Sequence, residues 1–354
     1  MTTRRDFLLS TTSAGVALLG SDQSKGQSPP PSTERRASLT KVKIPRTDLV
    51  VSRIAYGTNL ASLKWQSADF LDSAVRMLRV AYDTGINFFD LANFYQAGRS
   101  EEALGKSLEE SPGLRHTMVI QSKCGLVTRD WESFNRDLSQ GNIISSTEGS
   151  LRRLKTDHLD ILLLHYPDPL AQPEEIAAAF DHLHQSGKVR YFGVSNFNVS
   201  QLELLTRYVR QPIVANQVRL GLGYCYPLAG TSLRSVGYGP IVDYCQLKQI
   251  QVQAYSPLGL KNDVSLLRPP EDSTAEVKQM AEALEQIAKT RGIGPDSIAL
   301  AWLLRHSAGV VPIIGTTNPE HLAQNCAADG IELTREEWGR LFSLALSIQG
   351  LGWE

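Results

Sequence analysis

Eight short apolar runs, separated by stretches of helical periodicity, follow one another between residues 52 and 316. The runs are rich in β-branched and aromatic residues, whereas several of the stretches between them repeat apolar residues with the period of a helix. This alternation is typical of βα units whose strands pair in parallel. The expected strands are residues 52–58, 87–90, 117–123, 159–165, 189–195, 214–218, 252–258 and 310–316. The expected helices include residues 68–85, 100–110, 145–156, 174–188 and 318–329.

The number and length of these units favour one fold class, a (β/α)8 TIM barrel. Such a barrel needs about 250 residues plus insertions, which fits residues 41–354. A doubly wound sheet is the alternative, but it usually carries a G-x-G-x-x-G loop after its first strand, and the sequence here reads YGTNLAS. The extra residues fall at 41–50, an expected hairpin that covers the barrel bottom, in a loop at 219–240 and in a tail at 334–350.

The first forty residues differ from the rest of the chain. Residues 1–20, MTTRRDFLLSTTSAGVALLG, place Arg4 and Arg5 before an apolar, small-residue run and resemble a twin-arginine (Tat) signal peptide. Residues 21–40 are rich in Pro, Ser and Gln and are expected to form a disordered linker. The resemblance implies that the Tat export machinery moves the chain to the periplasm, without a lipoprotein anchor or a membrane span.

The composition limits the kinds of partner. Hydrophobic residues make up 42% of the chain and charged residues 21%, and the formal net charge is -1. A chain with so little net charge and no basic stripe does not favour nucleic acid or an anionic membrane surface. A small molecule is therefore the expected partner.

The spacing of cysteine and histidine does not indicate a metal site. His182 and His184 lie two residues apart in an expected helix, so their side chains point to nearly opposite sides. The cysteines form no C-x-x-C pair and are expected to be packing residues, with their disulfide state left open. They are Cys124, Cys225, Cys245 and Cys326.

Ionisable side chains stand at the ends of three consecutive expected strands. Asp90 ends the second strand and Tyr95 follows it, Lys123 ends the third and His165 ends the fourth. Each alone has a structural explanation, such as a turn residue or a satisfied core histidine. Because a TIM barrel gathers the carboxyl ends of its strands on one face, the four side chains are expected to meet in an active site.

The four residue types together suggest a proton-transfer site. A buried lysine needs a counter-charge, and Asp90 is the natural partner of Lys123. The nearby ammonium is expected to lower the pKa of Tyr95 from its usual value of about 10 and so make it a general acid. His165 can orient a carbonyl oxygen toward Tyr95. A hydride from a nicotinamide would supply the missing nucleophile.

These residues lie in motifs that resemble the aldo/keto reductase family over nearly all of residues 41–340. The motifs are GINFFDLANFY followed by GRSEEALGKSL, then VIQSKCG, DHLDILLLHYPDP, QSGKVRYFGVSNF, ANQV, AYSPLG and GTTNPEHLAQN. The resemblance implies a barrel that binds NADP(H) without a Rossmann domain and reduces aldehydes or ketones to alcohols, or runs the reverse. It places Asp90, Tyr95, Lys123 and His165 on the catalytic tetrad of the family.

The resemblance also implies the cofactor site. Ser195, Asn196 and Gln217 would hold the nicotinamide carboxamide, and Tyr255 would stack on the ring. Further cofactor positions are Gly57, Thr58, Ser256, Leu258, Gly259, Gly315, Thr316, Thr317, His321, Gln324 and Asn325.

The motif after the last strand departs from the family pattern. Many members place basic residues where this chain has Gly315 and His321, to clamp the adenosine 2'-phosphate. Thr316 and Thr317 can still bond a phosphate, because a helix N-terminus favours anions, but histidine is a weaker clamp than arginine. NADP(H) is the expected cofactor, with NAD(H) as the alternative.

The identity of the substrate is less constrained by the sequence. Trp65, Phe94 and Tyr166 are aromatic residues near the expected strand ends and are predicted to line the substrate pocket, although ordinary packing would also explain them. A regulatory protein that binds NADP(H) and acts through a protein partner is an alternative function. A metal-dependent barrel hydrolase is a third, but it requires more histidines or carboxylates at the strand ends.

Overall fold

The computed structural model describes residues 39–60, 62–127, 135–228, 241–260 and 265–351. The expected signal peptide and most of the expected linker lie outside these ranges, as does part of the loop at 219–240. No helix in the described ranges is long and apolar enough to cross a membrane.

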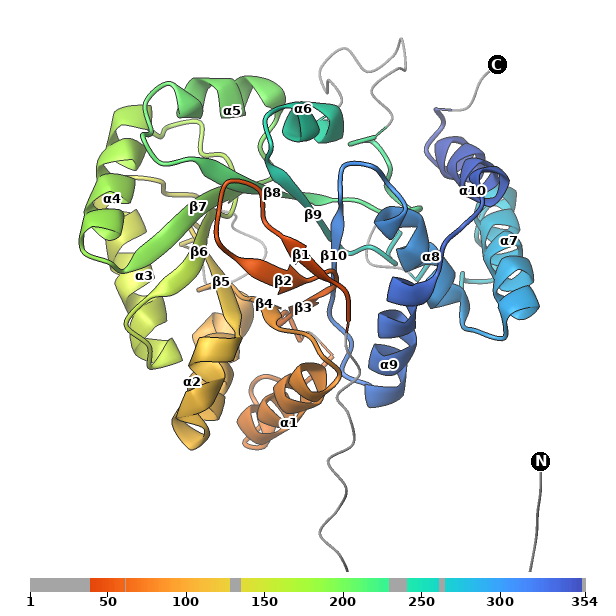
Figure 1. Ribbon diagram of the computed structural model, residues 1–354, viewed down its shortest axis with the longest axis horizontal. Helices are drawn as coiled ribbons and strands as arrows, with labels where there is room; N and C mark the ends of the chain where they lie inside the picture. Colours follow the sequence, from red (N-terminus) through yellow and green to blue (C-terminus); the bar gives the residue numbers. More distant parts are fainter. Residues whose placement is uncertain (1–38, 61, 128–134, 229–240, 261–264, 352–354) are drawn as a thin grey trace, which may run out of the picture. The chain divides into compact units, whose positions relative to one another are not determined.

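Eight parallel strands close into a barrel, which confirms the expected (β/α)8 TIM fold (Figure 1). They pair in the order β10-β3-β4-β5-β6-β7-β8-β9, so every neighbour in the sequence is also a neighbour in the barrel. The strands are β3 (Ala55–Gly57), β4 (Phe88–Asp90), β5 (Val119–Cys124), β6 (Leu159–Leu164), β7 (Val189–Ser195), β8 (Ile213–Arg219), β9 (Gln251–Tyr255) and β10 (Val311–Ile314).

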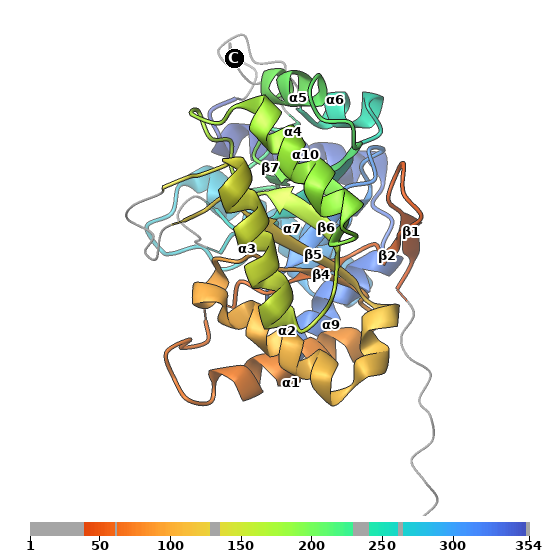
Figure 2. The ribbon, with the colours of Figure 1, turned by 90° about the vertical axis from the view of Figure 1, so that its left-hand side faces the viewer.

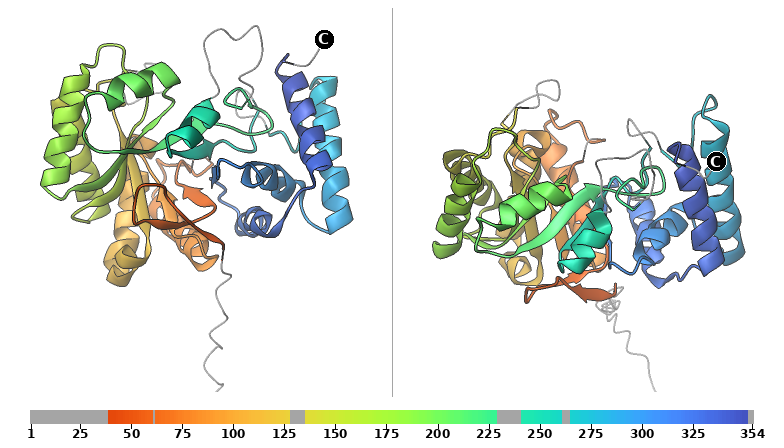
Figure 3. Two further views of the ribbon diagram at one scale, coloured as in Figure 1. Left: turned by 45° about the horizontal axis from the view of Figure 1, so that its top comes forward. Right: turned by 90° about the horizontal axis from the view of Figure 1, so that it is seen from above.

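An antiparallel hairpin covers one end of the barrel, as the sequence indicated. Its strands are β1 (Lys41–Lys43) and β2 (Val50–Ser52), seen at the edge of the barrel in Figure 3. Ile44, Leu49 and Val51 belong to the same buried cluster as barrel residues such as Phe88 and Val119. The hairpin therefore closes the barrel interior at the end away from the carboxyl ends of the strands.

The helices surround the barrel, and α1 to α4 follow one another along the side that Figure 2 shows. Two helices, α7 and α8, separate β9 from β10, and the tail forms a further helix, α10, that packs on α7. The helices are α1 (Phe70–Asp83), α2 (Arg99–Glu110), α3 (Gln140–Leu154), α4 (Pro173–Gln185), α5 (Val199–Thr206), α6 (Ile241–Leu247), α7 (Ala275–Arg291), α8 (Pro295–Leu304), α9 (Pro319–Ala327) and α10 (Arg335–Ile348).

Helix starts follow local capping rules. Thr334 and Glu337 form a reciprocal capping box at the start of α10, and Asn198 forms one with Gln201 at α5. Helix α3 begins earlier than expected, because Ser139 caps it by accepting a hydrogen bond from a backbone N–H of its first turn.

All four cysteines are buried free thiols, in agreement with their expected packing role. Burial raises the pKa of the Cys124 thiol to about 12, so it stays protonated and unreactive at neutral pH.

Candidate active site

The expected catalytic side chains meet at the carboxyl end of the barrel. Lys123, on β5, is fully buried, and its Nζ donates to Asp90 Oδ2 at 2.7 Å, to the Leu91 carbonyl at 2.8 Å and to Tyr95 Oη at 3.0 Å. Parallel pairing of β4 with β5 brings Asp90 beside this strand. Tyr95 opens the 3-10 turn Tyr95–Gly98 after β4, and its phenol lies within hydrogen-bond distance of Lys123. A carboxylate, an ammonium and a phenol are thus linked in one buried chain.

The second carboxylate oxygen of Asp90 is held by amides. Gln121 Nε2 donates to Asp90 Oδ1 at 2.6 Å, and Gln217 Nε2 donates to the same oxygen at 2.9 Å. Asp90 is 1% exposed, and its carboxylate accepts hydrogen bonds from Lys123, Gln121 and Gln217 in place of water. These hydrogen bonds fix the orientation of the carboxyl group in the barrel.

The expectation that Lys123 lowers the pKa of Tyr95 is wrong for this structure. Burial raises the pKa of Tyr95 well above 10, and the negative charge of Asp90 raises it further. Burial also lowers the pKa of Lys123, although Asp90 opposes that change. Sequence reasoning counted the nearest cation and left out the loss of water, which dominates in an enclosed site. Tyr95 is therefore a phenol that holds its proton at neutral pH.

His165 lies against the same tyrosine. Its ring is edge-on to Tyr95, with centroids 5.8 Å apart, and stacks on Tyr166 at 5.2 Å. Burial, together with the charge of Lys123, holds the pKa of His165 well below 6.5, so the imidazole is neutral. Its Nδ1 is buried without a hydrogen-bond partner among the described residues. A neutral imidazole next to the phenol can donate one hydrogen bond to a carbonyl oxygen.

A cavity of about 460 Å³ opens beside this group, and most of the expected cofactor loop residues line it. Asp90 and Tyr95 lie in its wall, and Asn325 lines it as well. The remaining lining residues are Gly57, Asn59, Tyr255, Ser256, Pro257, Leu258, Gly259, Ser265, Ile313, Ile314, Gly315 and Thr316. Five lining residues were not identified from the sequence: Asn59, Pro257, Ser265, Ile313 and Ile314. Asn59, Pro257 and Ile314 are chain neighbours of residues that were identified, whereas Ser265 and Ile313 are not.

The lining of this cavity fits a nicotinamide cofactor. Gly315 leaves open space, because a Cβ there would find its nearest atom, the Gly57 carbonyl oxygen, at 3.5 Å. Gly259 is similarly open, and close approach of backbone to phosphate needs such positions. The aromatic ring of Tyr255 offers a flat face in the same wall.

The expected carboxamide-binding residues lie together and are hydrogen-bonded to one another. Tyr255 Oη donates to Asn196 Oδ1 at 3.0 Å, and Asn196 Nδ2 donates to Ser195 Oγ at 3.1 Å and to the His165 carbonyl at 3.2 Å. Asn196 and Ser256 have positive φ angles of 63° and 49°. Strained backbone of this kind persists where the surrounding structure fixes it, often at functional sites.

The expected 2'-phosphate region is weakly basic. Asn318 caps α9 by accepting from the backbone N–H groups of Glu320 and His321, and the hydroxyl groups of Thr317 and Ser62 are 2.9 Å apart. Gln324 and His321 are exposed on the first turns of the helix. With its amide nitrogen turned inward, Asn325 donates to Asp296 Oδ2 at 2.6 Å. The buried Thr58 hydroxyl instead donates to the Asp90 carbonyl at 3.1 Å.

Of the three expected substrate-pocket residues, Tyr166 contacts a catalytic side chain. Tyr166 stacks on His165. The Arg136 guanidinium also lies over the Tyr166 ring, 5.3 Å from its centroid. Trp65 is 38% exposed, and Phe94 is half-buried just before Tyr95. Contact of Trp65 and Phe94 with a substrate stays a prediction.

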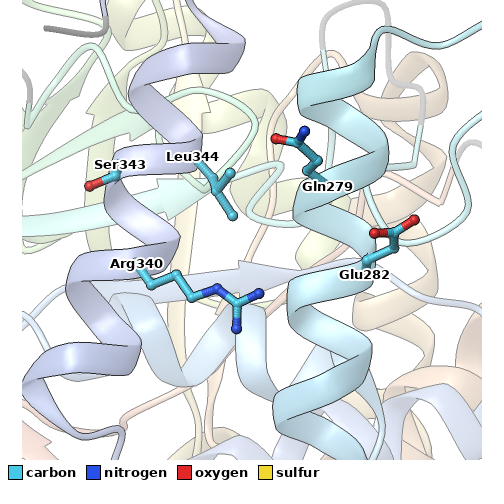
Figure 4. A pocket seen from close by; sticks show the side chains of 5 residues that line it. All are labelled: Gln279, Glu282, Arg340, Ser343 and Leu344. Carbon is cyan, nitrogen blue, oxygen red and sulfur yellow. The ribbon is translucent and has the colours of Figure 1, made fainter.

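A second hollow, formed by described residues, does not share this chemistry. Figure 4 shows a polar groove between α7 and α10, into which Gln279 and Arg340 point. His182 and His184 lie on α4, outside the barrel interior. In the described part of the chain, no group of three or more His, Cys, Asp or Glu side chains is placed to hold a metal ion.

Comparison with known proteins agrees with this geometry. Residues 53–345 match the model of the aldo/keto reductase family. An uncharacterized oxidoreductase of Bacillus subtilis is 34% identical over 86% of this chain and 96% of its own length. A 6-dehydroglucose reductase of Agrobacterium fabrum is 36% identical over 84% of this chain and 95% of its own. The crystal structure of a thermostable aldo-keto reductase with the inhibitor epalrestat superposes with a TM-score of 0.72, at 28% identity, covering 86% of this chain and all of that one.

Proposed function

Because the chain belongs to the aldo/keto reductase family and is an NAD(P)(H)-dependent oxidoreductase, we propose that Tyr95, Lys123, Asp90 and His165 carry out its reaction. That reaction is the reduction of an aldehyde or ketone to an alcohol, or the reverse. The observation that supports these roles most directly is Lys123, whose ammonium bonds both Asp90 and Tyr95 within one buried site.

Each side chain has a separate part in the reduction. A nicotinamide held in the cavity lined by Tyr255 and Gly259 would supply the hydride for the carbonyl carbon. Tyr95, which burial keeps protonated, gives its proton to the carbonyl oxygen as negative charge develops there. Lys123 then stabilises the phenolate at 3.0 Å, and Asp90 holds Lys123 in place. The neutral His165 donates a hydrogen bond that orients the carbonyl.

NADP(H) is the cofactor that we propose, with NAD(H) as a competing one. Thr316 and Thr317 offer hydroxyl groups beside the start of α9, where the helix dipole favours a phosphate. Gly315 and His321 supply no fixed positive charge there, so the preference for NADPH should be small. His321→Arg should raise it, because an arginine can bind the phosphate through two hydrogen bonds.

The substrate that we propose is a small carbonyl compound, and sugar-derived aldehydes and ketones belong in the first panel. A relative named 6-dehydroglucose reductase motivates their inclusion. The stacked Tyr166 and nearby Arg136 would suit a ring-shaped or polar molecule. We also propose that the Tat-type N-terminus directs the chain to the periplasm.

The test of the function is an assay in which the protein receives NADPH or NADH and each carbonyl compound of this panel. The nicotinamide absorbance then measures the oxidation of the coenzyme. Tyr95→Phe should lower kcat by about 10²–10⁴-fold while coenzyme binding is retained, because the acid is lost and the ring stays. Tyr208→Phe, at a 42% exposed position on the segment after α5, is the matched control. Tight coenzyme binding by the wild-type protein without turnover of any carbonyl would instead favour the regulatory alternative.

A further inference from the structure

Glutamines fill the barrel interior next to the catalytic site. Gln121 on β5, Gln217 on β8 and Gln253 on β9 are all at most 2% exposed. Interior positions of such barrels are dominated by branched apolar residues, and a buried amide without partners is costly. Each amide of this cluster should therefore have hydrogen-bond partners inside the barrel.

Two of the amides direct their N–H groups at Asp90. Gln121 Nε2 uses one N–H for Asp90 Oδ1, at 2.6 Å, and the other for Gln253 Oε1, at 2.8 Å. Gln217 Nε2 does the same, at 2.9 Å and 3.1 Å. An ionised carboxylate only accepts hydrogen bonds, so both amides must turn their nitrogen toward it.

Gln253 completes the cluster. Its Oε1 accepts from both Gln121 and Gln217, and its Nε2 donates to Gln121 Oε1 at 2.9 Å and to Gln251 Oε1 at 3.4 Å. Rotating any one of these amides would set two donors or two acceptors against each other. The charge of Asp90 thus fixes one orientation for the whole cluster, and the cluster in turn fixes Asp90.

We propose that Gln121 and Gln253 are positioning residues for the reductase reaction. They hold Asp90 Oδ1 from the barrel interior so that Oδ2 faces Lys123, and Lys123 in turn faces Tyr95. This inference rests on the proposed roles of Tyr95 and Lys123. Gln121 acts on Asp90 directly, and Gln253 acts through the reciprocal amide pair.

The amides also affect the charge that develops during the reaction. Their N–H dipoles point toward Asp90 and lower the energy of negative charge in that part of the site. The charged and titratable groups that face Tyr95 are Lys123 from β5, Asp90 from β4, His165 after β6, and Tyr166 and Tyr255. Loss of the amides should therefore make the Tyr95 phenolate less stable, both as the product of proton transfer in carbonyl reduction and as the base in alcohol oxidation.

The experiment compares kcat and its pH profile in wild type, Gln121→Met and Gln253→Met. Methionine keeps the length of the side chain and removes its hydrogen bonds. We expect kcat to fall by about tenfold or more in Gln121→Met, the size expected for a lost hydrogen bond to a charged group, with the KM for the coenzyme unchanged. In alcohol oxidation, which needs the phenolate, the rise of kcat with pH should move to higher pH.

A double variant separates catalysis from folding. Each single variant leaves amide groups of its partner unsatisfied and should lower the unfolding midpoint. Gln121→Met with Gln253→Met removes both members of the reciprocal pair and leaves one Gln217 N–H without the Gln253 acceptor. We expect the double variant to recover much of the midpoint and to keep the low kcat and the displaced pH profile. Gln211→Met, which removes an amide hydrogen bond to the Asp181 carboxylate outside the active site, is the control and should keep kcat within about twofold.

Three results would overturn the inference. One is a double variant whose kcat and pH profile equal those of wild type, and another is a Gln211→Met variant that loses as much kcat as Gln121→Met. In both cases the wild-type enzyme turns over and the proposed function stands. Absence of any turnover by the wild type would remove the proposed function and this inference together.

Discussion

Lys123 places an ammonium group inside the barrel, where it is 0% exposed, and Asp90 neutralises it. Removing one partner of such a pair leaves the other charge buried, which costs more than the pair gains. We expect Lys123→Met to lower the free energy of unfolding by about 3–5 kcal/mol and to abolish turnover. Denaturant unfolding of Lys123→Met and of the double variant with Asp90→Leu checks this. The double variant should regain part of the stability but not activity, because the amide N–H groups of Gln121 and Gln217 lose their acceptor. A fully stable single variant would contradict the argument.

The pH dependence of kcat for carbonyl reduction should be set by two neighbouring side chains, His165 and Tyr95. Burial holds the pKa of His165 well below 6.5 and raises that of Tyr95 well above 10, so neutral imidazole and protonated phenol coexist over a wide range. The carbonyl-reducing form is therefore present between these two values and is lost below the first, where His165 gains a proton. We expect kcat for reduction to vary by less than about twofold from about pH 6 to pH 8. A steep fall of kcat as the pH drops through about 6.5 would contradict the depressed pKa of His165.

At the scale of elements, α2 packs against α3 so closely that one glycine is required. A Cβ on Gly105 would lie 2.1 Å from the Arg153 carbonyl oxygen of α3. Alanine normally favours a helix by about 1 kcal/mol over glycine, but here the overlap should outweigh that gain. We expect Gly105→Ala to destabilise the protein by about 1–3 kcal/mol in denaturant unfolding. Gly141→Ala on α3, where nothing lies within 4 Å, is the control and should be neutral or stabilising.

The elements themselves were largely predictable, because apolar period and length mark strands that are buried on both faces. The eight barrel strands and the β1–β2 hairpin lie where the sequence indicated. Boundaries were less accurate. The strand expected at 252–258 ends at Tyr255, because Ser256 takes a positive φ, and no apolar pattern reports a backbone angle. Likewise the pairing of α7 with α10 depends on a long-range contact that local periodicity does not encode.

The active site, like the elements, was predicted from the sequence only in part. Asp90, Tyr95, Lys123 and His165 were placed together from their positions at strand ends, and the barrel geometry brings them into contact. Gln121 and Gln253 were missed, because a glutamine within an apolar run looks like an interruption until the cross-barrel contacts are known. The direction of the pKa shift of Tyr95 was wrong because a sequence does not show how deeply a residue is buried.

For the whole molecule, the remaining question is where the enzyme works, and the paired arginines near the N-terminus allow a test. Export is measured by expressing the protein in a bacterium that has a Tat pathway. Reductase activity is then assayed in the periplasmic and cytoplasmic fractions. We expect Arg4→Lys with Arg5→Lys to retain the enzyme in the cytoplasm as active protein, because lysine keeps the charge and loses the guanidinium geometry. Arg35 and Arg36 form a second pair in the expected linker, and their change to lysine is the matched control. Export of the first variant at the wild-type level, or equal loss in the control, would refute a twin-arginine signal.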